Sequence, residues 1–301
     1  PDADGQGFKS LRKALSGISR LNQTNFLIRG FRIFRLTLLV LSGLLLTLCL
    51  LPLCSEAARL RLKSSWAVAL LDALGVEVEA DLAHALPGVL LVANHVSWID
   101  IYVINAVMPA AFVAKAEVRD WPVLGWLAAR NDTIFLRRGS RGHAHIVNRQ
   151  VAELLGKGRH VAVFPEGTTT DGRSLLYFHA ALLQPALSAG KPVLPVAISY
   201  WEADGQRSLA PRYDGDIPLG QCTRAILGRK RLIARLVTTP LLGLQGESRK
   251  QVAAEARAAI AFAAGLPLTH NPPEIPADLP AAMQSNDHPI DSRNPVLVDL
   301  V

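Results

Sequence analysis

A polar stretch at residues 94–100 contains the residue types best suited to moving a proton. It reads NHVSWID and follows the apolar run Val89–Ala93, which predicts a buried strand. A histidine with a pKa near neutrality can accept a proton, and a carboxylate one helical turn away can fix the tautomer of its ring. His95 and Asp100 have these types and this spacing. Such a pair is suited to removing the proton from a substrate hydroxyl, with no serine nucleophile required.

The same stretch also has a purely structural interpretation. Ser97 and Asp100 have the spacing of a capping box, in which a hydroxyl and an acid bind free backbone N–H groups at the start of a helix. His95 would then be an ordinary loop histidine with a hydrogen-bond partner. From these residues alone, both interpretations stay open.

A second stretch, FPEGT at Phe164–Thr168, follows a predicted strand at His160–Phe164. Pro165 and Gly167 are typical of a surface turn. They can equally hold backbone N–H groups open toward a ligand near Glu166, because glycine permits close approach.

Two further stretches end or interrupt predicted strands. Ile134–Gly139 is an apolar run that ends in Arg137 and Arg138. Arginines at a strand end can be simply solvated, or their planar guanidinium groups can bind a phosphate. Val193–Ala197 holds Pro195 inside a strand pattern, where proline is poorly tolerated, so we expect a local bulge there.

From about residue 76, short apolar runs alternate with helical periods, which is typical of an α/β domain. We predict strands at Val89–Ala93, Ala111–Ala114, Thr133–Leu136, His160–Phe164, Val193–Ser199 and Leu232–Val237. We predict helices at Ser97–Val107 and Ser248–Ala264, and a third through Val147, Val151, Leu154 and Leu155. Polar residues that directly follow a strand lie at the carboxyl edge of such a sheet, where ligands usually bind.

The longest uncharged run extends from Leu36 to Leu53. As a helix it would span about 27 Å, against a hydrocarbon core of roughly 30 Å. Basic residues lie on both sides of it, so the positive-inside rule gives no clear orientation. We expect a helical hairpin, Leu36–Leu53 followed by roughly Glu56–Leu74, that enters one leaflet of a membrane with both ends on the cytoplasmic side. A single span and a removed signal peptide are the alternatives.

The composition also favours contact with lipid. Charged residues make up 19% of the chain and its mean hydropathy is +0.24. The net charge of +7 suits an anionic membrane or nucleic acid, but no basic run with interleaved aromatic residues favours nucleic acid. The three cysteines have neither a disulfide pattern nor the spacing of a zinc site, so we expect no metal.

The four stretches, in this order and at these separations, resemble the glycerolipid acyltransferase family, and within it the bacterial 1-acylglycerol-3-phosphate acyltransferases. The resemblance covers roughly residues 70–245. The NHxSxxD block of the family is matched by Asn94, His95, Ser97 and Asp100, and FPEGT is matched by Phe164, Pro165, Glu166, Gly167 and Thr168. Val193, Pro195 and Val196 match the last block. In the remaining block Arg138 takes the arginine position, whereas Arg137 replaces an acid.

The resemblance implies an α/β fold, with a glycerolphosphate-acyltransferase-like mixed sheet flanked by helices. It implies that His95, oriented by Asp100, deprotonates a lysolipid hydroxyl, which attacks the thioester of acyl-CoA or acyl-carrier protein. No metal, other cofactor or covalent acyl-enzyme is implied. An acceptor pocket would be formed by Arg137, Arg138, Glu166, Gly167 and Thr168, and backbone N–H groups near Gly167 would stabilise the oxyanion.

The expected reaction is acylation of the free sn-2 hydroxyl of lysophosphatidate to phosphatidate, on the cytoplasmic face of a bacterial inner membrane. The expected partners are the lysophospholipid acceptor, the acyl donor and membrane lipid, and no nucleic acid. A lyso-ornithine lipid or another lysolipid is an alternative acceptor. A lipid hydrolase and a non-catalytic membrane-binding protein are rivals of another class, although no G-x-S-x-G motif supports a serine hydrolase.

These expectations divide the chain into four segments. They are a basic N-terminal segment at 1–35, a membrane-associated helical hairpin at 36–75, the acyltransferase catalytic domain at 76–264, and a Pro-rich tail at 265–301. The tail carries no apolar period, so we expect it to be disordered.

Overall fold

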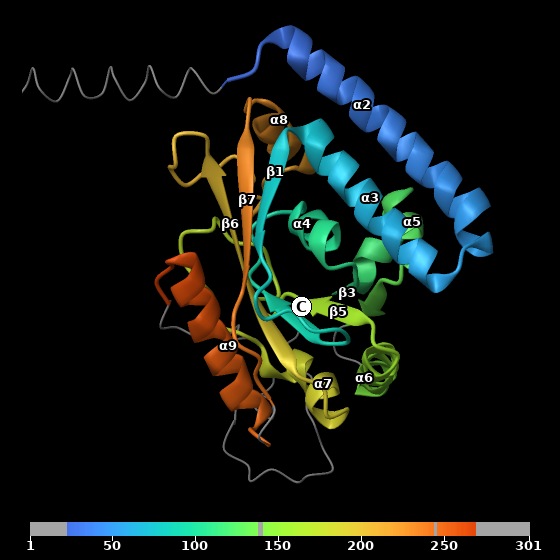
Figure 1. Cartoon of the computed structure of the whole chain (residues 1–301), viewed down its shortest axis with the longest axis vertical. Helices are drawn as coiled ribbons and strands as arrows, with labels where there is room; N and C mark the ends of the chain where they lie inside the picture. The colour runs from blue at the N-terminus through green and yellow to red at the C-terminus, as the bar shows by residue number, and fades with distance from the viewer. Residues whose placement is uncertain (1–22, 138–140, 244–245, 269–301) are drawn as a thin grey trace, which may run out of the picture. The chain divides into compact units, whose positions relative to one another are not determined.

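The computed structural model describes residues 23–137, 141–243 and 246–268 (Figure 1). Arg138, most of the predicted tail and most of the predicted basic segment lie outside these residues. The chain forms two compact units. The first unit comprises the described residues up to Asp81, with Val96–Pro109 and Ile198–Leu236. The second unit comprises Leu82–His95, Ala110–Ala197 and the described residues from Val237 on.

Seven strands form one sheet in the order β1-β7-β6-β2-β5-β3-β4. Their bounds are Val76–Asp81 (β1), Leu90–Ala93 (β2), Ala110–Lys115 (β3), Ile134–Leu136 (β4), His160–Val163 (β5), Val193–Glu202 (β6) and Leu232–Thr238 (β7). Within the second unit, β2 pairs in parallel with β5 and β6, and β3 pairs in parallel with β5 and β4. An antiparallel bridge joins Val193 to Leu242, beyond the end of β7. The predicted fold class, an α/β mixed sheet flanked by helices, is confirmed.

The predicted strands match the buried centre of this sheet. All four residues of β2 are buried, as are Val161, Ala162 and Val163 of β5. Strands covered on both faces have continuous apolar runs, which is why their sequence was readable. In the same unit α6 (Arg141–Gly156) and α9 (Arg249–Ala264) contribute to a shared hydrophobic core.

The bulge predicted at Pro195 is not found on the β2 side of β6. Over the described pairs from Leu90↔Val193 to Ala93↔Val196 the register does not slip, and Pro195 lies opposite Val92. The Pro195 carbonyl accepts a hydrogen bond from the Thr239 N–H at 3.0 Å. Because the N–H and C=O of one strand residue point to the same side, the N–H that proline lacks would have faced away from β2.

Strand β1 was missed by the sequence analysis. Apolar and charged residues alternate along its sequence, but only Val76 is buried and most of the others are exposed. The strand lies at one end of the strand order. Glu77 forms an ion pair at 2.7 Å with Arg231, which directly precedes β7, and Glu79 forms one at 2.8 Å with Arg235 on β7. The charged residues that hide the strand in the sequence therefore pair across it.

The N-terminal part of the first unit is a helical hairpin, as predicted. Helix α2 (Phe26–Leu45) continues through a π-helical and a 3-10 turn to Leu53, and α3 (Glu56–Leu74) runs back beside it (Figure 1). The Trp66 indole N–H donates to the Leu39 carbonyl at 3.0 Å. The continuous segment Phe26–Leu53 is long and apolar enough to cross a membrane, judged by length and composition, and only 11% of its most apolar window is buried.

Helix α2 begins ten residues before the predicted run, at Phe26 rather than Leu36. Its first turn is capped by Asn25, whose side chain accepts from the Ile28 N–H at 2.9 Å. Arg32 donates to the carbonyls of Arg229 and Lys230, and Arg35 pairs with Asp72 at 2.6 Å. Because these arginines find partners within the unit, they extend the helix instead of ending it.

The remaining helices connect successive strands along the chain. They are α4 (Asp100–Val107), α5 (Leu124–Arg130), α7 (Gln184–Ser188) and α8 (Leu219–Leu227), with 3-10 turns at Ala116–Asp120 and Ala180–Leu183. Helix α4 starts three residues later than predicted, because the residues before Asp100 form a turn rather than a helix. Helix α9 begins after Ser248, which forms a capping box with Gln251.

Candidate active site

Asp100 is the most enclosed of the predicted site residues. It has no solvent exposure and stands at the first position of α4. Its Oδ2 accepts from the backbone N–H groups of Val96 at 2.7 Å and Ser97 at 2.8 Å, and its Oδ1 accepts from the Tyr200 hydroxyl. A buried carboxylate is stable only when its oxygens are bonded in this way. Asp100 therefore fixes the turn between β2 and α4.

The Tyr200 hydroxyl serves Asp100 as a permanent donor. Tyr200 lies on β6 and is 3% exposed. Burial, and next the adjacent Asp100 carboxylate, raise the pKa of this phenol well above its ordinary value of 10. The phenol thus keeps its proton at physiological pH and holds one oxygen of Asp100.

The capping interpretation of this turn describes part of these bonds. The Asp100 carboxylate binds the Ser97 N–H, as the acid of a capping box does. The Ser97 hydroxyl, however, accepts from the Ile99 N–H at 3.5 Å, and the Asp100 N–H donates to the Ser97 carbonyl. The bond from Tyr200 to the second oxygen has no place in a capping box, so capping alone does not account for the arrangement.

His95 lies in the second unit and is held through its backbone. Its N–H donates to Glu166 Oε1 at 2.8 Å, and its carbonyl accepts from the Thr170 N–H at 2.8 Å. The imidazole stacks on the Phe164 ring, with centroids 3.9 Å apart and planes 10° from parallel. The side chain is partly exposed. The Phe164 ring thus covers one face of the imidazole, and the residue stays partly exposed.

Glu166 joins three segments of the second unit. It is 4% exposed, with Oε1 bonded to the His95 N–H and Oε2 bonded to the Leu176 N–H at 2.9 Å. Gly167 adopts a φ of +69°, a conformation that favours glycine, and its N–H donates to the Phe164 carbonyl at 3.0 Å. One carboxylate oxygen of Glu166 therefore supports the His95 backbone, and the other holds the segment at Leu176. The predicted contact of Glu166 with an acceptor stays a prediction.

The other predicted residues are distributed as follows. Asn94 is buried at the end of β2, and Pro165 is buried beside Glu166. Thr168 is exposed and Gly167 is partly exposed. Arg137 is exposed directly after β4, whereas Arg138 lies outside the described residues.

Two functional candidates were missed by the sequence analysis. Tyr200 is separated from Asp100 by 100 residues, and Thr170 bonds the His95 carbonyl through both its N–H and its hydroxyl. A signal for Tyr200 existed, because a single tyrosine in an otherwise apolar strand requires a partner for its hydroxyl. Among the described residues, no group of three or more His, Cys, Asp or Glu side chains could hold a metal ion.

Comparison with known proteins gives consistent matches. Residues 75–199 match the family model described as Acyltransferase. A lyso-ornithine lipid O-acyltransferase of Pseudomonas aeruginosa is 41% identical over 205 residues, which cover 68% of this chain and 79% of that protein. A 1-acyl-sn-glycerol-3-phosphate acyltransferase of Neisseria gonorrhoeae is 42% identical over 170 residues, which cover 56% of this chain and 66% of that protein.

A solved structure supports the fold. The crystal structure of the 1-acyl-sn-glycerophosphate acyltransferase from Thermotoga maritima matches with a TM-score of 0.56 at 24% identity, over 79% of this chain and 95% of that one. This likeness concerns the fold alone. The family follows from the sequence relatives, since one of them is matched over 79% of its length at 41% identity. The chain belongs to the acyltransferase family.

Proposed function

We propose that this chain is an O-acyltransferase of lysolipids in which His95 is the general base. The observation that carries the proposal is the support of His95, whose backbone is bonded on both sides while its ring rests on Phe164 and remains partly exposed. A base must be positioned and also reachable by its substrate.

In the proposed reaction, the unprotonated ring nitrogen of His95 takes the proton from the acceptor hydroxyl. The acceptor oxygen attacks the thioester carbonyl of acyl-CoA or acyl-carrier protein, so that a C–O bond forms and the C–S bond breaks. The imidazolium then returns the proton to the departing thiolate. Asp100 fixes the tautomer of His95 in this scheme, which needs neither a metal nor a covalent acyl-enzyme.

The acceptor we favour is lysophosphatidate, with phosphatidate as the product. Its phosphomonoester carries up to two negative charges, which the guanidinium groups of Arg137 and Arg138 are suited to bind. Arg137 is exposed directly after β4, where a ligand can reach it. The Neisseria gonorrhoeae relative bears the corresponding name.

A lyso-ornithine lipid is the second candidate acceptor. The Pseudomonas aeruginosa relative with that name is matched over 205 residues, compared with 170 for the Neisseria gonorrhoeae protein. In addition, Arg137 replaces the acid of the family block, which alters the charge beside Arg138.

A single assay separates these functions. The full chain in neutral detergent micelles is supplied with acyl-CoA, and thiol release is followed with lysophosphatidate, with lyso-ornithine lipid and with no acceptor. We expect kcat/KM to be at least tenfold higher for lysophosphatidate. The reverse ratio assigns the ornithine lipid, release that is independent of acceptor indicates a hydrolase, and no release with any acceptor contradicts catalysis.

We also propose that the protein works at the cytoplasmic face of a bacterial inner membrane. The exposed apolar helix α2 and the net charge of +7 support this location. The two ends of the hairpin α2–α3, near Gln23 and near Asp72, lie on one side of the membrane in this arrangement, so labels at Gln23 and Asp72 should both react from the cytoplasm. Labelling from opposite sides would establish a true span.

A further inference from the structure

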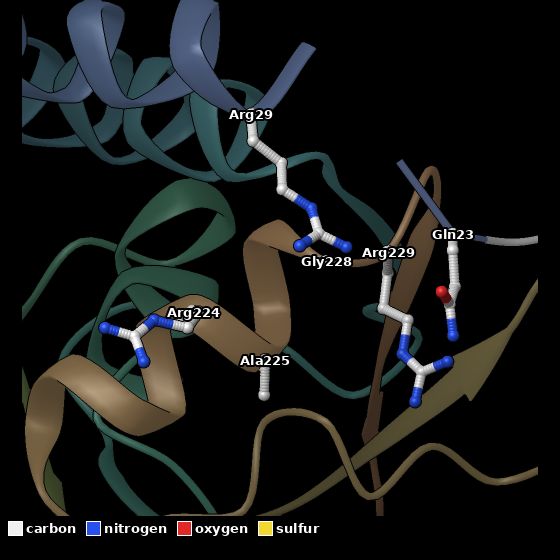
Figure 2. Close-up of a pocket in the computed structure, with 6 residues that line it drawn as sticks. All are labelled: Gln23, Arg29, Arg224, Ala225, Gly228 and Arg229. Atoms are coloured by element: carbon white, nitrogen blue, oxygen red, sulfur yellow. The ribbon is translucent and has the colours of Figure 1, made fainter. Parts of the chain in front are cut away.

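A cavity lined by arginines lies in the first unit, at the start of the apolar helix α2. Its volume is about 210 Å³, and it is lined by Gln23, Arg29, Arg224, Ala225, Gly228 and Arg229 (Figure 2). These residues come from the beginning of α2, from α8 and from the turn before β7. None of them belongs to the four motif stretches, so the reaction proposed above leaves the cavity unexplained.

The wall of the cavity is fixed by backbone bonds. The Thr24 N–H donates to the Gly228 carbonyl at 3.0 Å, and the Thr24 hydroxyl donates to the Leu227 carbonyl at 2.8 Å. Gln23 and Arg229 form an antiparallel bridge, which places their side chains next to each other, as Figure 2 shows. The segment before α2 is therefore attached to the end of α8, and the arginine side chains are not what holds it.

The guanidinium groups around the cavity retain donors for a ligand. Arg29 donates through Nε to the Thr24 hydroxyl at 2.9 Å, and its guanidinium extends toward Gly228 in Figure 2. Arg229 pairs with Glu202 through Nε at 3.3 Å. Arg224 is exposed, and its side chain forms no hydrogen bond or ion pair with the residues that the structure describes. Of these three arginines, Arg229 is the one whose pairing with a carboxylate, that of Glu202, the described residues show.

The cavity adjoins an apolar surface. Phe26 and Leu27, between Gln23 and Arg29 in the chain, are 85% and 76% exposed. Phe31 and Phe34 continue this surface along α2, at 61% and 59% exposure. If α2 enters a membrane, its charged first turn lies at the level of the lipid head groups, where arginine side chains meet phosphates.

We propose that this cavity binds the phosphate of an anionic glycerophospholipid, whose acyl chains lie along the exposed apolar side chains of α2. A guanidinium group forms two parallel bonds to a phosphate, so Arg29 and Arg229 suit a single anionic head group, and the Arg224 side chain, which points away from them in Figure 2, would turn toward it. The bound lipid would link α2, α8 and the turn before β7 at the membrane surface. The proposal does not depend on which acceptor the enzyme acylates.

The test measures binding of short-chain phosphatidylglycerol to the full chain in neutral detergent micelles, by native mass spectrometry. Phosphatidylcholine and inorganic phosphate are the comparison ligands. Arg224→Gln removes a side chain that no described residue binds, so it leaves the fold intact, and Arg224→Gln/Arg229→Gln removes two cavity charges. The matched control is Arg149→Gln/Lys250→Gln, which removes two positive charges outside the cavity from exposed positions on α6 and α9.

We expect phosphatidylglycerol to bind at least tenfold more tightly than phosphatidylcholine. The double variant Arg224→Gln/Arg229→Gln should weaken this binding at least tenfold, and Arg224→Gln alone at least threefold. The control variant Arg149→Gln/Lys250→Gln should change it by no more than twofold. An undirected attraction to basic surface is worth about fivefold per charge, so it would affect both pairs alike and overturn the proposal. Equal binding of the two lipids would also overturn it, as would inorganic phosphate that competes as well as the lipid, because free phosphate would then be the ligand.

Discussion

The turn at residues 94–100 and the arginine-lined cavity both depend on charged side chains, but they use them in opposite ways. In the turn, Asp100 is fully buried and both of its oxygens accept hydrogen bonds from the protein. At the cavity, Arg224 is exposed and binds no described residue. A buried charge that loses a partner leaves polar groups without bonds, whereas an exposed charge returns to water. Changes at the motif stretches should therefore be severe, and changes at the cavity graded.

The largest effect is expected for His95→Ala. Loss of the general base should lower turnover by about 10²–10⁴-fold. The fold should persist, because His95 is bonded to Glu166 and Thr170 through backbone atoms that alanine retains. Thiol release from acyl-CoA with lysophosphatidate measures the loss, and thermal unfolding serves as the control. Full turnover in a folded variant would remove His95 from the mechanism.

Glu166→Ala tests, through the free energy of unfolding, whether a carboxylate that binds backbone N–H groups matters more than an exposed one. It leaves the partly buried N–H groups of His95 and Leu176 without their acceptors, and each such group costs up to about 1–3 kcal/mol. We expect the free energy of unfolding to fall by about 2–6 kcal/mol in total. Glu153→Ala is the matched control, since Glu153 is exposed and pairs only loosely with Arg149 at 3.9 Å. Equal effects of the two variants in urea unfolding would contradict the supporting role of Glu166.

Arg138→Ala tests the acceptor. Charge-assisted hydrogen bonds to a phosphate contribute roughly 1.5–3 kcal/mol each, so we expect use of lysophosphatidate to fall by about 10–150-fold. Acyl-CoA hydrolysis without acceptor should change little. Competition with a lyso-ornithine lipid supplies the comparison. A variant that loses both acceptors equally would retain the acyltransferase proposal and reject the phosphatidate one.

Tyr200→Phe separates a catalytic role of Asp100 from a purely structural one. Loss of the phenol donor removes one of the bonds that hold the Asp100 carboxylate in place and leaves more negative charge on Oδ1. In the proposed mechanism, a less firmly held carboxylate orients the His95 ring less well and so lowers turnover, while its fuller charge raises the pH at which the ring loses its proton. We expect kcat to fall about tenfold with little change in KM, as for one lost charge-assisted bond. The acidic limb of the pH–rate profile should move to higher pH. A variant that is only less stable, with an unmoved profile, would indicate that Asp100 merely caps the turn.

The same contrast explains how much could be read from the sequence. Strands β2 and β5 are buried on both faces, so their apolar runs predicted them. The motif stretches NHVSWID and FPEGT follow the ends of these two strands, so their positions could be predicted as well. The hairpin was predicted from its uncharged run. Its true start at Phe26 was hidden, because nothing local indicates that Arg32 binds carbonyls about 200 residues away.

The remaining misses have similar causes. Tyr200 bonds Asp100 across 100 residues, and β1 is an edge strand whose exposed glutamates pair with Arg235 on β7 and with Arg231 directly before it. The bonds that Glu166 accepts from the backbone N–H groups of His95 and Leu176 could not be read from the sequence, and its predicted contact with the acceptor stays a prediction. Patterns of burial are encoded locally, but long-range polar pairs are not.

The smallest expected effect concerns His160, at the start of β5, which extends the comparison to a partly buried group whose charged form is disfavoured. Burial lowers the pKa of His160 below its ordinary 6.5, outweighing a backbone hydrogen bond with Val89 that raises it. Below pH 6.5 the unfolded chain therefore takes up a proton that the folded chain does not, so this residue's contribution to stability is present above that pH and is lost as the pH falls. His160→Gln should make the decline in free energy of unfolding between about pH 6.5 and 5 shallower, whereas His84→Gln, at an exposed position, should leave it unchanged. Urea unfolding at several pH values measures both slopes, and a slope that His160→Gln does not alter would show that the burial of this imidazole carries no proton linkage.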